Sequence, residues 1–389
     1  MCCRAWKREA AWKVVWKVRI AYGVHGYGQG HAARALAVLP DLASRYDVQV
    51  YAGGDAYEAL RERFSVERIP TMRYHYRGGR RCTIRTLRHN LPHVLDLLTG
   101  GRSVQHVLRT MQRFAPEVVI SDAESWTHAA ARRLGVPRIG FDHFGMMVHC
   151  RLDLSPADWL RSFIDRGVYR LLTASPERVL ISSFFSAATL CQNIEIIPPL
   201  LRDEVHEVRA SQSDHLLVYL NHGSAQLTPA VLRALSRTGV PVLLYGSGRQ
   251  GKAGTITYRP QGNRAFLEDL ASCRAVISTA GNQLVGEALR FGKPMLVLPE
   301  ATVEQRLNAR AIVRLGIGEV SEFESFQSSH VKRFLSRLDV YSQAARRLNA
   351  DGRERALGRL HQWIQELSTQ HRTQPLPSAF RRAPAGEAA

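Results

Sequence analysis

Residues 278–315 constrain the fold of this chain more than any other stretch. A short apolar run at Ala275–Ser278 leads into a small-residue turn at Ala280–Gly281, and a helical segment follows until Pro294. A second apolar run at 295–298 precedes a polar loop and a further helical segment. Strand, turn, helix, strand, loop and helix in this order describe a βαβα unit, which predicts part of a parallel sheet.

Polar residues follow both predicted strands of this unit, where open parallel sheets bind their ligands. They are Gly281 and Asn282 after the first strand and Glu304, Gln305 and Asn308 after the second. Glu287 lies six residues after Gly281, about one and a half turns into the helix. A carboxylate at that place can accept hydrogen bonds from two vicinal hydroxyl groups, such as those of a ribose.

This stretch resembles the donor-sugar signature of the GT-B glycosyltransferases, in particular the branch related to MurG. The resemblance implies that Glu287 holds the nucleotide ribose, and that Glu304 and Gln305, ahead of Asn308, hold the donor sugar. The lipid II branch has two glutamines where this chain has Glu followed by Gln, so the resemblance leaves the sugar open. An ordinary α/β domain with polar surface residues is the alternative.

A glycine-rich turn follows the first predicted strand, over residues 23–31. A dinucleotide fingerprint is one interpretation, but the glycine spacing and the absence of an acid at the end of the next strand disfavour it. The turn instead resembles the loop ending in His of MurG-like and antibiotic-modifying glycosyltransferases. That resemblance implies acceptor-side roles for Gly28 and Gly30 and a general base at His31. A helix-capping histidine is the simpler alternative.

Three further polar residues end predicted strands of the same half. Asp122 closes the apolar strand at 118–121 and is expected to emerge beside His31, either as its partner or as the base itself. Asp142 and His143 end the next strand, at 138–141. We expect this pair to face the acceptor, although structural capping explains them equally well.

Strands alternate with helices along the whole chain, which predicts two facing Rossmann-like, doubly wound parallel-sheet domains. We place the acceptor-side domain at residues 17–201 and the nucleotide-sugar domain at 202–367, with a Pro-Pro hinge at 196–201. Residues 1–16 form a basic, Trp-containing extension, and 368–389 have no apolar period and are expected to be disordered.

The GT-B resemblance implies an inverting, metal-independent transfer of a sugar from a nucleotide sugar to an acceptor hydroxyl, and we expect the donor to be a UDP-sugar. The sequence suggests no metal site or cofactor beyond this co-substrate. Backbone N–H groups near Gly281–Asn282 and Ser224 would stabilise the departing diphosphate. A nucleotide-sugar epimerase on the same fold and a non-enzymatic binder of anionic polymers are the alternatives.

The positive charge of the chain suggests where the acceptor is located. The formal net charge is +19, and nine arginines between Arg73 and Arg113 face a single acid, Asp96. Because no nucleic-acid-binding motif accompanies this charge, an anionic membrane with a lipid or cell-envelope glycan acceptor is favoured over nucleic acid. No apolar run is long enough to span a bilayer, and no secretory signal is recognised. We therefore expect a cytoplasmic protein that binds peripherally to the cytoplasmic face of the inner membrane.

Overall fold

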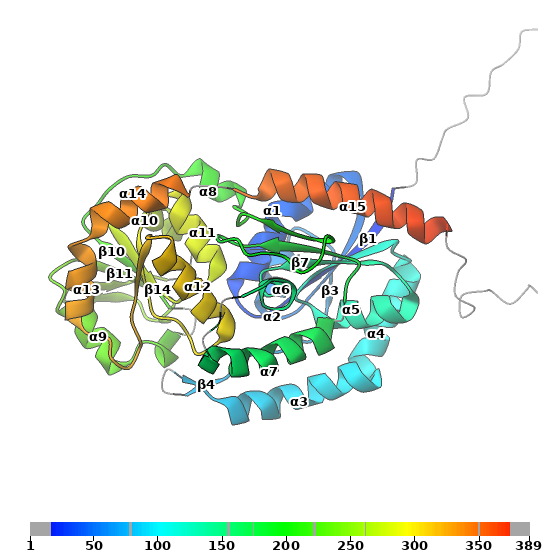
Figure 1. Ribbon diagram of the computed structural model, residues 1–389, viewed down its shortest axis with the longest axis horizontal. Coiled ribbons are helices and arrows are strands. Elements are labelled where there is room, and N and C mark those ends of the chain that lie inside the picture. Colours follow the sequence, from blue (N-terminus) through cyan, green and yellow to red (C-terminus); the bar gives the residue numbers. More distant parts are fainter. Residues whose placement is uncertain are drawn as a thin grey trace, which may run out of the picture.

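Two seven-stranded sheets with helices packed against them form the two halves of this chain in the computed structural model (Figure 1). The structure describes residues 17–373 apart from 78–79, 153, 155, 174, 221–222, 261 and 349–350. The predicted extension at 1–16 and residues 374–389 of the predicted tail lie outside this part of the chain. The expected fold class, two doubly wound parallel-sheet halves, is confirmed.

The first sheet is parallel throughout and has the order β3-β2-β1-β6-β7-β8-β9. Its central strands are short apolar runs buried on both faces, as expected of a sheet covered by helices on each side. The strands are β1 (Arg19–Val24), β2 (Asp47–Ala52), β3 (Val66–Arg68), β6 (Val118–Asp122), β7 (Arg138–Asp142), β8 (Arg178–Ser182) and β9 (Ile194–Ile197).

The second sheet repeats this order as β13-β11-β10-β14-β15-β16 and adds β12 antiparallel to β13. In both sheets the strand order reverses beside the first strand of that half, and ligands of doubly wound sheets bind at this reversal. The strands are β10 (Leu216–Tyr219), β11 (Val242–Tyr245), β12 (Gly251–Ala253), β13 (Ile256–Tyr258), β14 (Ala275–Ser278), β15 (Met295–Val297) and β16 (Gly318–Val320).

Helices connect the strands of each half. Those of the first half are α1 (Gln29–Arg45), α2 (Gly54–Leu60), α3 (Thr83–Thr99), α4 (Arg102–Phe114), α5 (Ser125–Leu134), α6 (Gly145–His149) and α7 (Pro156–Thr173). Those of the second half are α8 (Asp203–Glu207), α9 (Pro229–Ser236), α10 (Asn263–Ser272), α11 (Asn282–Arg290), α12 (Val303–Arg314), α13 (Ser328–Leu335) and α14 (Leu338–Arg347). A small hairpin, β4 (Tyr76–Arg77) with β5 (Arg80–Arg81), precedes α3.

The last helix, α15 (Arg353–Thr373), returns to the first half and crosses above its sheet in Figure 1. Leu360, Trp363 and Ile364 share a buried cluster with strands β1 and β6. The expected second-domain boundary at 367 is therefore wrong for this helix. The expected disorder from Ser368 is also wrong as far as Thr373, because Ser368 is buried and the helix continues beyond it.

The two places where the chain crosses between the halves are joined by one side chain. Asp351 Oδ1 accepts hydrogen bonds from the backbone N–H groups of Leu201 (3.1 Å) and Arg353 (2.9 Å). Since β9 extends to Ile197, the predicted hinge begins later than expected, at Pro198. One apolar cluster also contains buried residues from both halves, so the halves share part of their core.

Candidate active site

The reversal point of the first sheet brings the glycine-rich turn next to Asp122. Strands β1 and β6 are neighbours, with Val24 opposite Asp122, and the His25 N–H donates to the Asp122 carbonyl at 3.0 Å. Gly28 precedes α1 with φ of +87°, a conformation that favours glycine. This turn places His31 in the first turn of α1, above the end of β6.

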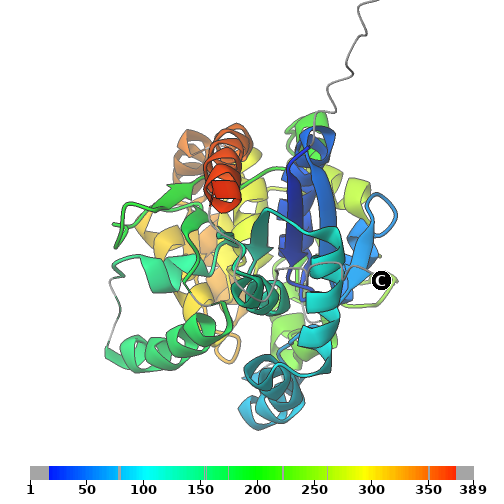
Figure 2. The same cartoon turned by 90° about the vertical axis from the view of Figure 1, so that its right-hand side faces the viewer.

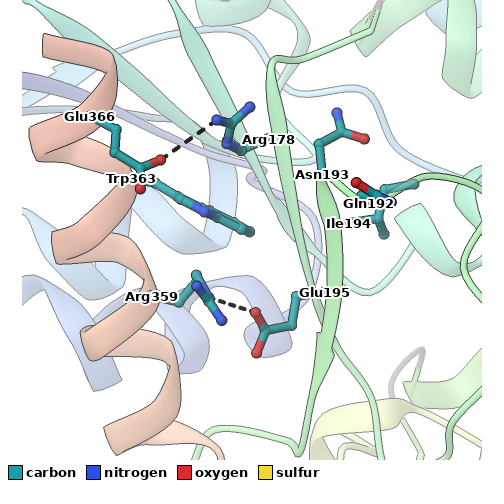
Figure 3. Close-up of a pocket in the computed structure, with 8 residues that line it drawn as sticks. All are labelled: Arg178, Gln192, Asn193, Ile194, Glu195, Arg359, Trp363 and Glu366. Atoms are coloured by element: carbon teal, nitrogen blue, oxygen red, sulfur yellow. Dashed lines mark ion pairs between the residues drawn. The ribbon is translucent and has the colours of Figure 1, made fainter. Parts of the chain in front are cut away.

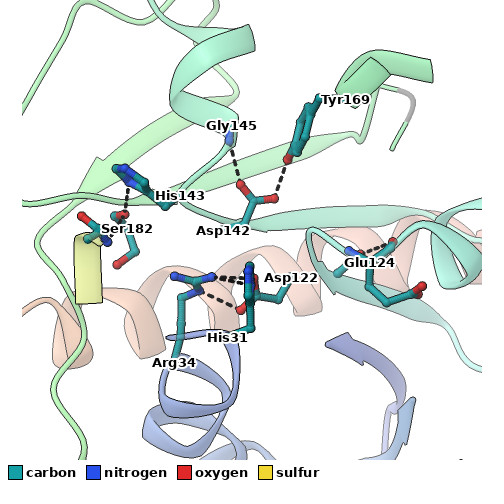
Figure 4. Close-up of polar contacts among 11 residues, drawn as sticks. His31, Arg34, Asp122, Glu124, Asp142, His143, Gly145, Tyr169 and Ser182 are labelled. Carbon is teal, nitrogen blue, oxygen red and sulfur yellow. Dashed lines mark hydrogen bonds and ion pairs between the residues drawn. The ribbon is translucent and has the colours of Figure 1, made fainter. Parts of the chain in front are cut away.

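His31 and Asp122 form a hydrogen-bonded pair (Figure 4). His31 Nδ1 lies 2.7 Å from Asp122 Oδ1, and the His31 side chain is 12% exposed whereas that of Asp122 is fully buried. The carboxylate holds the proton on Nδ1, because a carboxylate can only accept. The other ring nitrogen, Nε2, has no hydrogen-bond partner among the described residues. A buried acid behind a reachable imidazole is the arrangement that general-base catalysis requires.

Arg34 completes this cluster, and the sequence analysis did not assign it a role. Its Nε lies 2.8 Å from Asp122 Oδ2 and its Nη2 lies 2.5 Å from Oδ1. Burial alone would raise the pKa of Asp122, but the charges of Arg34 and His31 outweigh it, so the pKa lies below its ordinary value. The spacing of three residues between His31 and Arg34, which puts both on one face of α1, was the available signal.

Asp142 occupies the end of the neighbouring strand, β7. It accepts a hydrogen bond from the backbone N–H of Gly145 at 2.7 Å and another from the Tyr169 hydroxyl of α7. Burial, together with the nearby charge of Asp122, raises the pKa of Asp142. These contacts fit the capping interpretation of Asp142, since the carboxylate joins α6 and α7 to the sheet.

The predicted donor residues of the second half gather at the ends of β14 and β15. Gly281 caps α11, and the Asn282 side chain accepts from Phe184 N at 3.3 Å and donates to Ser182 O at 3.1 Å. Asn282 therefore holds the donor turn against the end of β8 in the first half. Ser224 lies in the short 3-10 helix Gly223–Ala225, and its side chain lies outside the described residues.

Three of the predicted donor residues lie on α12 and form a connected set. Gln305 Oε1 accepts from the backbone N–H groups of Ala280 (3.2 Å) and Glu300 (3.0 Å). Asn308 Nδ2 donates to Ala280 O at 2.8 Å and to Glu304 Oε1 at 2.6 Å. The amides thus hold the strand-end turns in place, and the Glu304 side chain, 15% exposed, remains reachable.

Comparison with known proteins agrees with this geometry. A family model described as Glycosyl transferase family 1 matches residues 18–339. The chain belongs to this family. It is a glycosyltransferase, and the MurG-related GT-B resemblance seen in its sequence is confirmed.

Individual relatives are distant. A PGL/p-HBAD biosynthesis rhamnosyltransferase of Mycobacterium bovis is 23% identical over 401 residues, which covers 87% of this chain and 85% of that protein. The solved glycotransferase of kitacinnamycin superposes with a TM-score of 0.68 at 16% identity, covering 90% of this chain and 99% of that one. MurG of Acinetobacter baumannii superposes with a TM-score of 0.56 at 14% identity, covering 89% and 99%. These structures share the fold.

Glu287 lies deeper in this glycosyltransferase than its predicted contact with ribose suggests. It is 3% exposed, forms an ion pair with Arg202 at 3.4 Å and accepts from Gln283 Nε2 at 3.3 Å. Burial raises the pKa of Glu287 despite the neighbouring guanidinium. The ribose role of Glu287 stays a prediction. Because Arg202 directly follows the hinge, its ion pair also connects Glu287 to the hinge segment.

The acceptor-side loop approaches the donor side closely at Gly30. A Cβ atom at Gly30 would lie 3.6 Å from the Cβ of Gln283, in the first turn of α11. The beginnings of α1 and α11 therefore meet across the boundary between the halves. Two helix N-termini in one place form a region of positive potential.

Other surfaces of the enzyme carry fewer side chains that could act on a substrate. A pocket lies between β9 and α15 (Figure 3), but its charges are paired, Glu195 with Arg359 and Arg178 with Glu366, and none of the predicted site residues lines it. Within the described residues there is no cluster of three or more His, Cys, Asp or Glu side chains placed to hold a metal ion. No helix in that part of the chain is long and apolar enough to cross a membrane.

Proposed function

We propose that this enzyme transfers a sugar with inversion from a nucleotide sugar, most simply a UDP-sugar, to an acceptor hydroxyl, with His31 as the base. The acceptor oxygen attacks the anomeric carbon, the bond from that carbon to the diphosphate breaks, and His31 Nε2 takes the hydroxyl proton. Asp122 then stabilises the imidazolium. The observation that carries this proposal is the His31–Asp122 pair at 2.7 Å, with Nε2 left unbonded by the described residues.

Metal independence is proposed from the positive potential at the two helix starts. The N-termini of α1 and α11 meet where Gly30 approaches Gln283. Backbone N–H groups there, after Gly28 and at Gly281–Asn282, can stabilise a departing diphosphate without a cation. Ser224, after the first strand of the second sheet, lies at the same reversal point and is proposed to join them.

The donor sugar is proposed to lie against Glu304, Gln305 and Asn308, with the ribose toward Glu287. The Gln305 and Asn308 amides are held by backbone groups, so Glu304 is the side chain left to select sugar hydroxyls. The relative named as a rhamnosyltransferase adds rhamnose to the donors that deserve testing.

The acceptor is proposed to be a lipid or glycan precursor presented by an anionic membrane. Helices α3 and α7 stand at the lower edge of the first half in Figures 1 and 2 and carry exposed apolar side chains. On α3 these are Ile84, Leu87, Leu91, Leu95 and Leu98, and on α7 they are Trp159, Leu160, Phe163, Val168 and Leu171. We call these ten residues the apolar surface. Several exposed apolar side chains on one helix beside basic residues are typical of a membrane-binding site.

The charge around the apolar surface favours anionic lipid. Exposed arginines Arg85 and Arg88 lie on α3 itself. Asp96, the single acid between Arg73 and Arg113, is occupied by the Ser103 N–H and the Trp126 indole N–H, both at 3.0 Å. The side chains of Arg77, Arg80 and Arg81, which the sequence also assigns to this region, lie outside the described residues.

A product assay tests the proposal. Purified protein is incubated with UDP-sugars and dTDP-rhamnose, with and without lipid extract and EDTA, and products are analysed by mass spectrometry and by NMR of the anomeric proton. We expect an inverted glycoside, formed with lipid extract and in the presence of EDTA. A retained configuration would exclude the single-base mechanism, and a donor consumed or inverted without any acceptor would favour the epimerase.

A further inference from the structure

His143, at the end of β7, forms a direct hydrogen bond between the two halves. The residue is 6% exposed, and its two ring nitrogens face two different oxygen atoms. Nδ1 lies 2.9 Å from the carbonyl oxygen of Ser182 in its own half. Nε2 lies 2.9 Å from the side-chain oxygen of Asn308 in the other half.

The orientation of the Asn308 amide follows from its other contacts. Its Nδ2 faces the Ala280 carbonyl at 2.8 Å and Glu304 Oε1 at 2.6 Å. A backbone carbonyl can only accept, so the amide must present its N–H groups on that side and its Oδ1 to His143. His143 Nε2 must then carry a proton for the bond between the halves to form.

A neutral imidazole has a single N–H, and the surroundings decide where it lies. Ser182 O already receives a hydrogen bond from Asn282 Nδ2 at 3.1 Å. Asn308 Oδ1 receives none except that from His143 among the described residues. A proton on Nε2 therefore stabilises the folded chain more than one on Nδ1, because a buried acceptor without a hydrogen bond costs free energy. Burial lowers the pKa of His143 to about 4, which keeps the ring neutral.

Glu304 connects this bond to the proposed donor sugar. Its Oε1 lies 2.6 Å from Asn308 Nδ2 and 3.6 Å from His143 Nε2. Through the Asn308 amide, the position of the Glu304 carboxyl group thus depends on a residue of the acceptor half. The bond to His143 can exist only while the two halves are together.

We infer that His143 is a positioning residue, which orients the Asn308 amide across the boundary between the halves and thereby directs Glu304 toward the donor sugar. This inference rests on the proposed donor site. It makes capture of the sugar, rather than of the nucleotide, depend on contact between the halves. The selection of the sugar is therefore shared between the halves, although the sugar-binding side chains belong to one of them.

Two amide substitutions separate the two contacts of His143. His143→Gln keeps a donor near the position of Nε2, which faces Asn308, whereas His143→Asn keeps one near Nδ1, which faces Ser182. We expect His143→Asn to raise the apparent KM for the UDP-sugar about tenfold, the effect of one buried hydrogen bond, and His143→Gln to stay within about threefold of wild type. The Kd for UDP, which lacks the donor sugar, should be unchanged in both variants.

The outcomes separate this inference from the proposed function. If wild-type protein neither binds UDP nor consumes a nucleotide sugar, the proposed function fails. If wild type transfers sugar and the two variants, with matched melting temperatures, have equal KM values, the role of His143 is overturned. Nitrogen-15 NMR of histidine-labelled wild type gives a test that does not depend on the folding of His143→Asn. The His143 signal is assigned as the one missing in His143→Gln. We expect this signal to show the Nε2–H tautomer, and an Nδ1–H tautomer would contradict the inference.

Discussion

The two halves of this glycosyltransferase build their parts of the site from different chemical groups. The first half uses charge: Asp122 lies within hydrogen-bonding distance of His31 and of the buried guanidinium of Arg34. The second half uses amides: Asn282, Gln305 and Asn308 are held largely by backbone groups. The charged groups of the first half can transfer a proton, whereas the amides of the second half hold the strand-end turns in one conformation. Related sheets thus serve different steps of one proposed reaction.

Removing the proposed base tests the charged half most directly. We expect His31→Ala to lower kcat by about 10²–10⁴-fold, the usual contribution of a general base. The Kd for UDP, measured by calorimetry, should be nearly unchanged because the donor residues belong to the other half. A His31→Ala enzyme that retains most of its activity would transfer the role of base to Asp122.

The difference between the halves also predicts where the last helix contributes stability. Trp363 is buried against the first sheet, so Trp363→Ala should lower the free energy of unfolding by about 3–5 kcal/mol. Hydrogen exchange should show the loss in β1 and β6 rather than in β10 and β14. The control is Trp159→Ala, an exposed tryptophan of α7, which should change stability by less than about 0.5 kcal/mol.

The contributions of Glu304 and Asp122 to the pH dependence of stability should have opposite signs. Burial, reinforced by the charge of Glu300, raises the pKa of Glu304 from 4.5 to about 8. The folded state therefore binds this proton more tightly, and the resulting stabilisation, complete below pH 4.5, is lost as the pH rises through 8. Glu304→Gln, which cannot ionise, should gain stability relative to wild type between pH 5 and pH 8 in urea titrations.

Asp122 provides the opposite case. Its pKa in the folded chain lies below the ordinary value of 3.8, so its stabilisation is present above that pH and is lost as the pH falls through the lower, folded value. Asp122→Asn leaves Arg34 buried without its charge partner and should cost about 3–5 kcal/mol at pH 7. A loss that stays constant down to pH 3 would contradict the ion pair.

The smallest expected effect concerns the apolar surface. Leu87 on α3 and Val340 on α14 are equally exposed, at 64% and 63%, but lie in different halves. Leu87→Glu should weaken binding to anionic liposomes several-fold, since it removes an inserting side chain and adds a repelled charge, whereas Val340→Glu should not. Sedimentation with liposomes at low and high salt measures this. Equal effects of the two variants would argue against the apolar surface as the membrane contact.

Much of the fold was predictable from the sequence because buried parallel strands are continuous apolar runs. The run Ala275–Ser278 matches β14 in full. Two of the strands that were not predicted, β3 (Val66–Arg68) and β16 (Gly318–Val320), are three residues long and carry charged side chains at the sheet edges. Edge strands bury less apolar surface, so their sequence carries less of the pattern.

The site was predictable from the sequence only where its residues follow directly from the ends of neighbouring strands. His31 and Asp122 come together because β1 and β6 are neighbours, and strand order predicts that. The contact of His143 with Asn308 joins residues 165 positions apart in different halves. It depends on the angle between the halves, which leaves no periodic signal in either segment. Glu287 and its partner Arg202 are likewise far apart in the sequence, although both belong to the second half.

The return of α15 to the first sheet has a consequence for synthesis of the chain. The first half is discontinuous, because its core needs residues up to Leu367, whereas the second sheet is complete at Val320. A ribosome therefore releases every strand of the second half before the helix that completes the first. Until α15 is made, the apolar residues of the first half that pack with Trp363 lack this partner. The second half, whose sheet is made last, is the first that can finish folding.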